Sequence, residues 1–439
     1  MVNIALIAMS GLRAADPTLT ELGMTLPGAI GRIQAIQSLP SLSLLTLAAL
    51  TPERHDVTYH EVRDIADLDV LPPCDLAAIS TYTAQAKDAY QLADRYRRAG
   101  ITTVIGGLHA TVLPQEALGH FDAVVVGEGE VSWARLLRDF EAGSLQETYR
   151  PEHEFDLADA PVPRFDLLEP ERYDRLTIQT QRGCPWRCDF CAASILLTPR
   201  YKVKPVERVV TEIQAIKRIW PEAFIEFADD NTFVNKKHAK RLMEGIAGEG
   251  VEWFTESDVA VAEDPELLRL MKEAGCAEIL IGFESPRREG LEGIELKRNW
   301  KAHQVDVYRK AIEQIQAHGI AVNACFVLGL DGDGPEVFDA IERFVEETTP
   351  FDVQITVMTA FPGTPLYSRL RDEDRLLEDG AWEKCTLFDV NIRPRRMSVQ
   401  ELRDGLINLA FRLYSQESTQ HRRAAFREHA GSLTTGQPS

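Results

Sequence analysis

Two series of alternating strand-like and helix-like segments, separated by a proline-rich stretch, limit the folds open to this chain. In the first series, short apolar runs alternate with amphipathic stretches, which predicts a doubly wound, Rossmann-like parallel α/β sheet with helices on both faces. Its predicted strands span residues 3–9, 57–62, 76–80, 102–106 and 123–126, and its predicted helices span 39–50, 84–98 and 131–141. In such sheets a ligand binds beyond the carboxyl ends of the strands.

The second series contains six strand-helix repeats, which predict a partial (β/α)6 barrel. Its predicted strands span 176–180, 224–228, 252–257, 278–283, 321–328 and 353–358, and its clearest helices span 206–220, 304–318 and 335–347. The domains are expected at 1–148 for the first sheet, 149–172 for a linker, 173–365 for the barrel and 366–439 for a small, mostly helical C-terminal region. That region has an amphipathic helix at 399–414 and is expected to end in a disordered polar tail.

Three cysteines, Cys184, Cys188 and Cys191, are crowded into eight residues directly after the first strand of the second series. Their CxxxCxxC spacing fits three irons of a 4Fe-4S cubane, and no fourth cysteine lies nearby to bind the last iron. An open iron is suited to an exogenous ligand, and so to chemistry rather than simple electron transfer. The alternatives are a structural zinc site, which needs a fourth ligand, and a loop of buried thiols.

Acidic side chains outnumber basic ones by 68 to 48, which gives a formal net charge of −20. Such a surface repels nucleic acid phosphates and disfavours a tRNA-modifying role. The longest apolar run, residues 42–50, is far too short to span a bilayer, and the amino terminus lacks the basic region of a secretion signal. The sequence therefore predicts a cytoplasmic protein without a membrane span.

The cysteine run, with the aromatic Phe190 just before the third cysteine, resembles the signature of the radical S-adenosylmethionine (SAM) superfamily. The resemblance implies that the open iron chelates SAM, and that one electron from the reduced cluster cleaves a carbon–sulfur bond to give a 5'-deoxyadenosyl radical. It also implies an external electron donor such as flavodoxin or ferredoxin.

Residues at the ends of later strands resemble further parts of the same superfamily. Asp229 follows the second barrel strand, where relatives bind the methionine amino group, and Glu284 ends the fourth, where they bind ribose hydroxyls. Ser257 stands where relatives often use arginine for the SAM carboxylate, and Gly329 stands where backbone approaches the adenine. The alternative for Asp229 and its neighbour Asp230 is an acidic turn that caps the next helix.

The strand ends of the first series resemble the cobalamin-binding domain that precedes the barrel in a large class of radical SAM enzymes, which includes anaerobic magnesium-protoporphyrin cyclases and hopanoid methylases. Glycines there let a large ligand approach backbone amides, whereas plain turn chemistry is the alternative. The implied contacts are Ser80, Thr81, Thr83, Gly106, Gly107, His109, Gly127, Glu128 and Gly129. Residues 8–13 lack the DxHxxG motif of typical cobalamin domains. Cobalamin is therefore expected to bind without a histidine below the cobalt, His109 included.

These resemblances imply a cobalamin-dependent radical SAM methyltransferase that acts on an unactivated carbon of a small-molecule metabolite. A cyclisation, ring rearrangement or oxidation with the same cofactors is the first alternative, and a non-catalytic corrinoid or redox sensor is the second. A tRNA methylthiotransferase is disfavoured because the chain has no second set of three cysteines and no basic tail. No motif identifies the substrate or the oligomeric state. Trp382, in the C-terminal region, is expected to be buried against the barrel.

Overall fold

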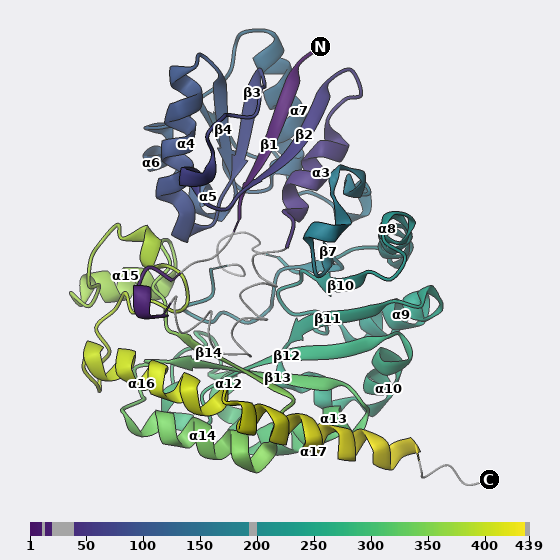
Figure 1. Ribbon diagram of the computed structural model, residues 1–439, viewed down its shortest axis with the longest axis vertical. Helices are drawn as coiled ribbons and strands as arrows, with labels where there is room; N and C mark the ends of the chain where they lie inside the picture. Colours follow the sequence, from purple (N-terminus) through teal and green to yellow (C-terminus); the bar gives the residue numbers. More distant parts are fainter. Residues whose placement is uncertain (11–13, 20–38, 193–199, 435–439) are drawn as a thin grey trace.

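The structure is a computed structural model that describes residues 1–10, 14–19, 39–192 and 200–434. Its N-terminal part is a sheet of six parallel strands in the order β2-β1-β3-β4-β5-β6, with helices on both faces (Figure 1). The strands are β1 (Asn3–Met9), β2 (Asp56–Val62), β3 (Leu76–Ser80), β4 (Thr102–Gly106), β5 (Ala123–Val125) and β6 (Thr148–Tyr149). The helices are α3 (Leu42–Leu50), α4 (Ala86–Arg98), α5 (Leu108–Val112), α6 (Pro114–Leu118) and α7 (Gly129–Glu141).

Alternate residues of β1 enter two different hydrophobic cores. Ala5, Ile7 and Met9 pack with α4 on one face, whereas Ile4 and Leu6 pack with α3 and α7 on the other. Because successive side chains of a strand point to opposite faces, a strand covered on both sides must be apolar throughout. In the sheet, β2 lies on one side of β1, and the next strand along the chain, β3, lies on the other side of β1. The topological switch point therefore lies at the carboxyl ends of β1 and β3.

The second sheet is an open barrel of six parallel strands in the order β14-β13-β12-β11-β10-β7. No hydrogen-bonded pairing joins the edge strands β7 and β14 within the described ranges. The strands are β7 (Leu176–Ile178), β10 (Phe224–Phe227), β11 (Glu252–Ser257), β12 (Cys276–Glu284), β13 (Ala321–Leu328) and β14 (Asp352–Val357). The main helices outside it are α8 (Val206–Ile219), α9 (Lys236–Ile246), α10 (Pro265–Glu273), α13 (Tyr308–Ala317) and α14 (Glu336–Thr348). In Figure 1, β1 runs from the N-terminus down toward this barrel, so its carboxyl end faces the barrel.

The C-terminal region is helical almost to its end, in α15 (Pro365–Asp372), α16 (Val399–Leu413) and α17 (Gln416–Thr434). The prediction of a disordered tail is therefore wrong up to Thr434, and residues 435–439 lie outside the described residues. Arg422 of α17 is buried and donates hydrogen bonds to the Leu413 carbonyl at 2.8 Å and to Oγ of Ser418 at 2.7 Å. The Phe426 ring meets Phe351 edge-on, with 5.2 Å between centroids. These tertiary contacts stabilise a helix whose polar sequence has little amphipathic pattern of its own.

Between α15 and α16 the chain returns to the N-terminal sheet. Trp382 is buried in the same core as α4, and its Nε1 donates to Oε1 of Glu116 at 2.8 Å. Beside it, Lys87 and Glu383 form an ion pair at 2.6 Å. The expected burial of Trp382 against the barrel is therefore wrong, because its core belongs to the N-terminal sheet. This segment fastens the C-terminal region to both parts of the molecule.

The predicted doubly wound sheet, partial barrel and helical C-terminal region are confirmed. The sequence did not reveal β6, α5 or α6, because elements of two to five residues are too short to show a period. Tyr149, expected to begin the linker, belongs to β6 and pairs with Val125 of β5. Among the described helices, none has the length and apolar character needed to cross a membrane.

Candidate functional site

The three cysteines follow β7 at the carboxyl edge of the barrel, where parallel barrels build their active sites. The pKa of Cys184 is raised to about 11 and that of Cys188 to about 12, mainly by burial and in smaller part by the neighbouring thiols. In the described part of the chain, no three His, Cys, Asp or Glu side chains are arranged so that they could hold one metal ion. A cubane does not require that, since each cysteine binds a different iron. The three thiols on one loop therefore fit the predicted cluster, whose binding must displace their protons.

Two carboxylates after β10 fasten the start of this loop. Asp229 is buried and accepts from the backbone N–H of Thr180 at 2.8 Å and of Gln181 at 3.1 Å, and from the hydroxyls of Thr180 and Thr232. Burial raises the pKa of Asp229 to about 6, although these hydrogen bonds oppose the shift. Asp230 accepts from the N–H of Gly183 at 2.7 Å, immediately before Cys184. Asp229 already has partners within the chain, and its contact with the SAM amino group stays a prediction.

The C-terminal region holds the same loop from another side. Between the second and third cysteines, the carbonyl of Asp189 accepts from the N–H of Leu366 at 3.1 Å, and its Oδ2 accepts from Nη2 of Arg369 at 3.0 Å. Arg369 also binds Asp331 at 2.5 Å. Both Leu366 and Arg369 lie on α15, so this helix positions the cysteine loop. Phe190 packs, partly buried, against the barrel core.

Glu284 ends β12 with a φ of +61°, a left-handed conformation that side chains other than glycine rarely adopt. Lys301 donates to its Oε1 at 2.5 Å and to the carbonyl of Gly282 at 3.0 Å. Burial alone would lower the pKa of Lys301, but the charges of Glu284, Cys188 and Tyr308, with the hydrogen bond to Glu284, together raise it. Lys301 was not expected from the sequence, because nothing in its spacing marks it. The ribose contact of Glu284 stays a prediction.

The remaining two predicted SAM contacts also have neighbours within the chain. The Ser257 hydroxyl, at the end of β11, donates to Oδ1 of Asn231 at 3.1 Å. Gly329, which follows β13 with a φ of +87°, faces Leu402 of α16, and a Cβ there would meet its Cδ2 at 2.8 Å. The small size of Gly329 thus lets the C-terminal region close on the barrel. Its approach to adenine stays a prediction, as does the carboxylate contact of Ser257.

Glu256, a residue not singled out in the sequence, is accessible to solvent, yet the surrounding protein desolvates its carboxyl group. Its pKa is raised to about 7, mainly by desolvation and in smaller part by four carboxylates, those of Glu226, Asp230, Glu284 and Asp229. The barrel interior is therefore a polar, acidic space.

At the carboxyl edge of the N-terminal sheet, most of the predicted side chains are turned inward. Thr81 and Thr83 are buried, whereas Tyr82 between them is 62% exposed. Burial by surrounding protein nevertheless raises the pKa of Tyr82, as does the carboxylate of Glu226 in the barrel. Tyr82 therefore projects from the switch point of the sheet into the space between the two parts of the molecule. Ser80 lies beside it, close to Gly107.

His109, on α5, has no exposed surface. Its Nε2 is 2.8 Å from the hydroxyl of Tyr90 and 3.5 Å from Glu116, and its ring meets Trp382 edge-on. Burial lowers its pKa despite the nearby carboxylate. These partners lie on α4, on α6 and in the C-terminal region, so His109 is held in a core, and its contact with cobalamin stays a prediction.

The loop after β5 is tied to the barrel by four charged residues, which we call the Glu128 cluster: Glu128, Glu130, Arg182 and Lys202. Arg182 donates to Glu128 at 2.8 Å and to Glu130 at 2.7 Å, and Lys202 donates to Glu128 at 2.8 Å. Burial would raise the pKa of Glu128, but the hydrogen bond from Lys202 and the charge of Arg182 lower it overall. Arg182 and Lys202 lie on the hairpin formed by β8 (Gln181–Arg182) and β9 (Lys202–Val203), which leads into Cys184. Glu128 therefore joins the two domains.

The glycines at the carboxyl edge of the N-terminal sheet allow backbone conformations or close contacts that a larger residue would hinder. Gly107 has a φ of +99°, and a Cβ there would meet Oγ of Ser80 and the carbonyl of Thr81 at 3.4 Å. Gly127 has a φ of +77° and lies against Pro151. Gly106 ends β4, and Gly129 begins α7 beside Leu47.

Three family models match successive parts of the chain. Residues 178–345 match the radical SAM superfamily, and residues 32–137 match the B12 binding domain. The chain thus combines a B12-binding domain with a radical SAM domain. Residues 364–439 match a domain of unknown function, DUF4070. The matched families confirm the predicted cofactors, which are SAM with its 4Fe-4S cluster in the barrel and cobalamin in the N-terminal domain.

Several curated relatives of this B12-binding radical SAM enzyme are methyltransferases. It is 27% identical to bacteriochlorophyllide d C-12(1)-methyltransferase of Chlorobaculum tepidum, over 85% of this chain and 82% of the relative. It is 28% identical to hopanoid C-2 methylase of Rhodopseudomonas palustris, over 78% and 66% respectively. It is 26% identical to anaerobic magnesium-protoporphyrin IX monomethyl ester cyclase of Cereibacter sphaeroides, over 72% and 56%.

Two solved structures share the fold of both domains. The structure of TsrM from Kitasatospora setae, with cobalamin and the iron–sulfur cluster bound, has a TM-score of 0.67 at 15% identity and covers 96% of this chain and 90% of its own. The structure of OxsB, with aqua-cobalamin and SAM bound, has a TM-score of 0.65 at 17% identity and covers 89% and 65%.

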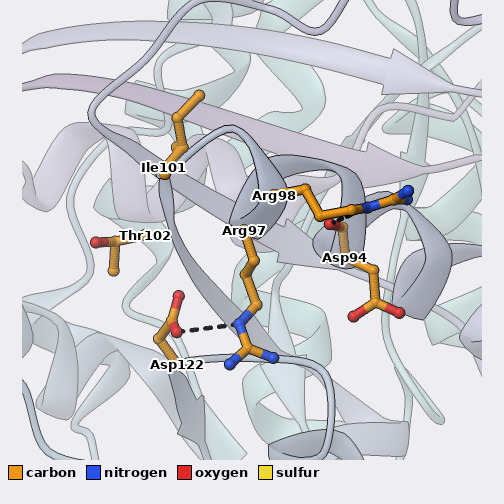
Figure 2. Close-up of a pocket in the computed structure, with 7 residues that line it drawn as sticks. Asp94, Arg97, Arg98, Ile101, Thr102 and Asp122 are labelled. Carbon is orange, nitrogen blue, oxygen red and sulfur yellow. Dashed lines mark hydrogen bonds and ion pairs between the residues drawn. The ribbon is translucent and has the colours of Figure 1, made fainter.

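A surface recess of about 690 Å³ lies at the opposite edge of the B12-binding sheet (Figure 2). Thr102, the first residue of β4, lines it together with Arg97, Arg98 and Asp94. Figure 2 shows Arg97 turned toward Asp122, to which it bonds at 3.2 Å. Because ligands of such sheets bind at the carboxyl ends of the strands, this recess lies away from the cofactor edge.

Proposed function

We propose that this protein transfers a methyl group from SAM, by way of cobalamin, to an unactivated carbon of a small-molecule metabolite. The observation that carries the proposal is the Glu128 cluster, which ties the glycine loop of the B12-binding domain to the hairpin that leads into the cysteine loop. These contacts bring the two cofactor edges next to each other, as transfer between two cofactors requires. The similarity of this chain to bacteriochlorophyllide and hopanoid methylases supports the reaction type.

When bound, the cluster with SAM supplies a 5'-deoxyadenosyl radical, and cobalamin carries a methyl group. The overall reaction exchanges one C–H bond of the substrate for one C–CH3 bond. It consumes two SAM molecules and two electrons, and it releases S-adenosylhomocysteine, methionine and 5'-deoxyadenosine, which retains the hydrogen. We propose an external flavodoxin or ferredoxin as the electron source and the cytoplasm as the location.

The chain's own residues are proposed to bind and orient the cofactors and to shield the radical from water. Cys184, Cys188 and Cys191 are proposed to ligate the cluster, and Asp229 keeps their loop in place. Glu284, held by Lys301, is proposed to bind the SAM ribose. The C-terminal region covers the cysteine loop through α15 and reaches the B12-binding domain through Trp382, which limits the access of water to a reactive radical.

The test uses anaerobically reconstituted protein with cobalamin, SAM labelled in its methyl group, and a low-potential reductant. We expect both S-adenosylhomocysteine and 5'-deoxyadenosine, and label in the product when bacteriochlorophyllide or a hopanoid serves as the probe substrate. Cobalamin-loaded protein that makes 5'-deoxyadenosine without any loss of label from SAM would refute methyl transfer.

That last result would favour the second candidate, a cyclisation or oxidation with the same cofactors, which the similarity to the magnesium-protoporphyrin cyclase supports. A protein that binds both cofactors and forms no 5'-deoxyadenosine under reducing conditions would instead indicate a sensor.

A further inference from the structure

A buried amide stands beside one of the cysteine sulfurs. Asn231, on the loop after β10, is 3% exposed, and its Nδ2 lies 3.8 Å from Sγ of Cys184, a hydrogen-bonding distance for the large sulfur atom. The sequence drew attention to the two aspartates just before this residue and not to the asparagine itself.

The partners of Asn231 decide which end of its amide faces the sulfur. Oδ1 accepts from the Ser257 hydroxyl at 3.1 Å and from the backbone N–H of Asp258 at 3.4 Å, while Nδ2 donates to Oδ2 of Asp258 at 2.8 Å. A flipped amide would turn its oxygen toward a carboxylate and its NH2 group toward two donors. Asn231 is therefore fixed with an N–H directed at Cys184.

Asp258 also holds the cysteine loop by a separate route. Its Oδ2 accepts from Nε1 of Trp186 at 2.7 Å, and the Trp186 ring is stacked on Trp300 with 4.4 Å between centroids. Two N–H groups thus share this carboxylate oxygen, which offsets part of its negative charge on the side of the cysteines. The network reaches a sulfur through Asn231 and braces the loop through Trp186, so the two effects can be separated by mutation.

We infer that Asn231 is a positioning residue that raises the reduction potential of the iron–sulfur cluster by donating a hydrogen bond to the Cys184 thiolate. An N–H donor draws negative charge from a ligating sulfur and so favours the reduced cluster, which carries one more electron. Ser257 takes part by fixing the orientation of the amide. The inference rests on the cluster of the proposed function and does not depend on methyl transfer.

The test is a redox titration of the reconstituted holoprotein, without SAM, followed by electron paramagnetic resonance of the reduced cluster. Asn231→Ala removes the donor, and its cluster should have an about tenfold less favourable reduction equilibrium, which is about 59 mV more negative for one electron. Ser257→Ala keeps the donor but frees its orientation, and should shift the potential less in the same direction. Iron and sulfide analysis of each variant ensures that complete clusters are compared.

Two matched variants distinguish the effect of hydrogen-bond donation to the Cys184 sulfur from the effect of a less ordered cysteine loop. Asn391→Ala removes a comparable amide that donates to Sγ of Cys385 at 3.7 Å, away from the cysteine loop, and should leave the potential unchanged. Trp186→Phe removes the other hydrogen bond to Asp258 but keeps a ring to stack on Trp300, and should change the potential far less than Asn231→Ala.

An unchanged potential in Asn231→Ala, or an equal shift in Trp186→Phe, overturns the inference. If the Asn231→Ala protein loses its cluster, the potential of Ser257→Ala decides the question: a more negative value supports the inference, and an unchanged or more positive value overturns it. A parent protein that assembles no cluster refutes the proposed function itself, whereas a parent with a cluster and an unresponsive potential refutes only the role of Asn231.

Discussion

The cysteine loop and the carboxyl edge of the B12-binding sheet are joined by the Glu128 cluster, but their predicted residues are arranged differently. At the cysteine loop the predicted residues are linked into one network, in which Asp229 fixes the end of β7 and Ser257 reaches Cys184 through Asn231. At the sheet edge Thr81, Thr83 and His109 are buried, and the exposed ring of Tyr82 lies between the two threonines.

The predicted ways of holding the two cofactors account for this difference. A cluster is bonded to side chains, so its ligands need a fixed loop and hydrogen-bonded support before the metal arrives. A corrin without a protein ligand to its cobalt is held by shape and by backbone groups, so its site needs close-approaching glycines and an unfilled space. Mutations should therefore act sharply at the cysteine loop and gradually at the sheet edge.

The largest effect is expected from Cys184→Ala. With one ligand lost, iron and sulfide content should fall to background and 5'-deoxyadenosine formation should cease, as anaerobic metal analysis and chromatography will measure. Cys276→Ala removes a buried cysteine of β12 and should retain the cluster. Cleavage of SAM by the Cys184→Ala protein would contradict the assignment of the cysteine loop.

Asp229→Asn should have the next largest effect. An amide cannot accept all the hydrogen bonds that Thr180, Gln181 and Thr232 donate, so we expect a loss of about 2 kcal/mol in stability and a several-fold fall in cluster content. Asp122→Asn is the matched control, because Asp122 accepts from the N–H and hydroxyl of Thr103 in the B12-binding sheet. It should lower stability while leaving the cluster intact, and equal cluster loss in both variants would contradict the prediction.

Tyr82→Ala and His109→Ala test the sheet edge against the core behind it. Loss of the exposed Tyr82 ring should weaken cobalamin binding about tenfold and alter the absorption spectrum of the bound corrinoid, because apolar contact area is lost. His109→Ala should lower the unfolding temperature and leave that spectrum unchanged, since the imidazole is enclosed by Tyr90 and Trp382. The reverse pattern would place His109, rather than Tyr82, against the corrin.

The smallest effect is expected from Glu256→Gln, as a change in pH dependence. The pKa of Glu256 is about 7 in the folded chain against an ordinary value of 4.5, so the folded state holds a proton that the unfolded state has released between these values. The stability that this proton provides is present below pH 4.5 and is lost as pH rises to 7. Glu256→Gln should therefore flatten the decline of the unfolding temperature over this range, and parallel curves for the two proteins would exclude the effect.

Most of the fold could be predicted from the sequence, because the strands of both sheets carry periods long enough to detect. The limits of β1, β3, β4, β11 and β13 agree with the predicted ranges residue for residue. The helix α17 could not be predicted, since it depends on the burial of Arg422 and on a contact with Phe351. Polar composition alone predicts disorder there.

At the candidate site, the sequence marked the cysteines, Asp229 and Glu284, but it could not assign the partners of these acids. Lys301, Asn231 and Glu256 carried no signal, because each matters only through residues that are remote in the sequence.

By itself the sequence determined the three candidate ligands and their place after the first barrel strand, because the spacing of three cysteines on one loop is a local property of the chain. Only the tertiary structure decided which groups surround them. Asn231 reaches Cys184 across 47 positions because the parallel pairing of β7 and β10 brings their carboxyl ends together. Pairing between distant strands fixes such contacts, and no local pattern encodes them.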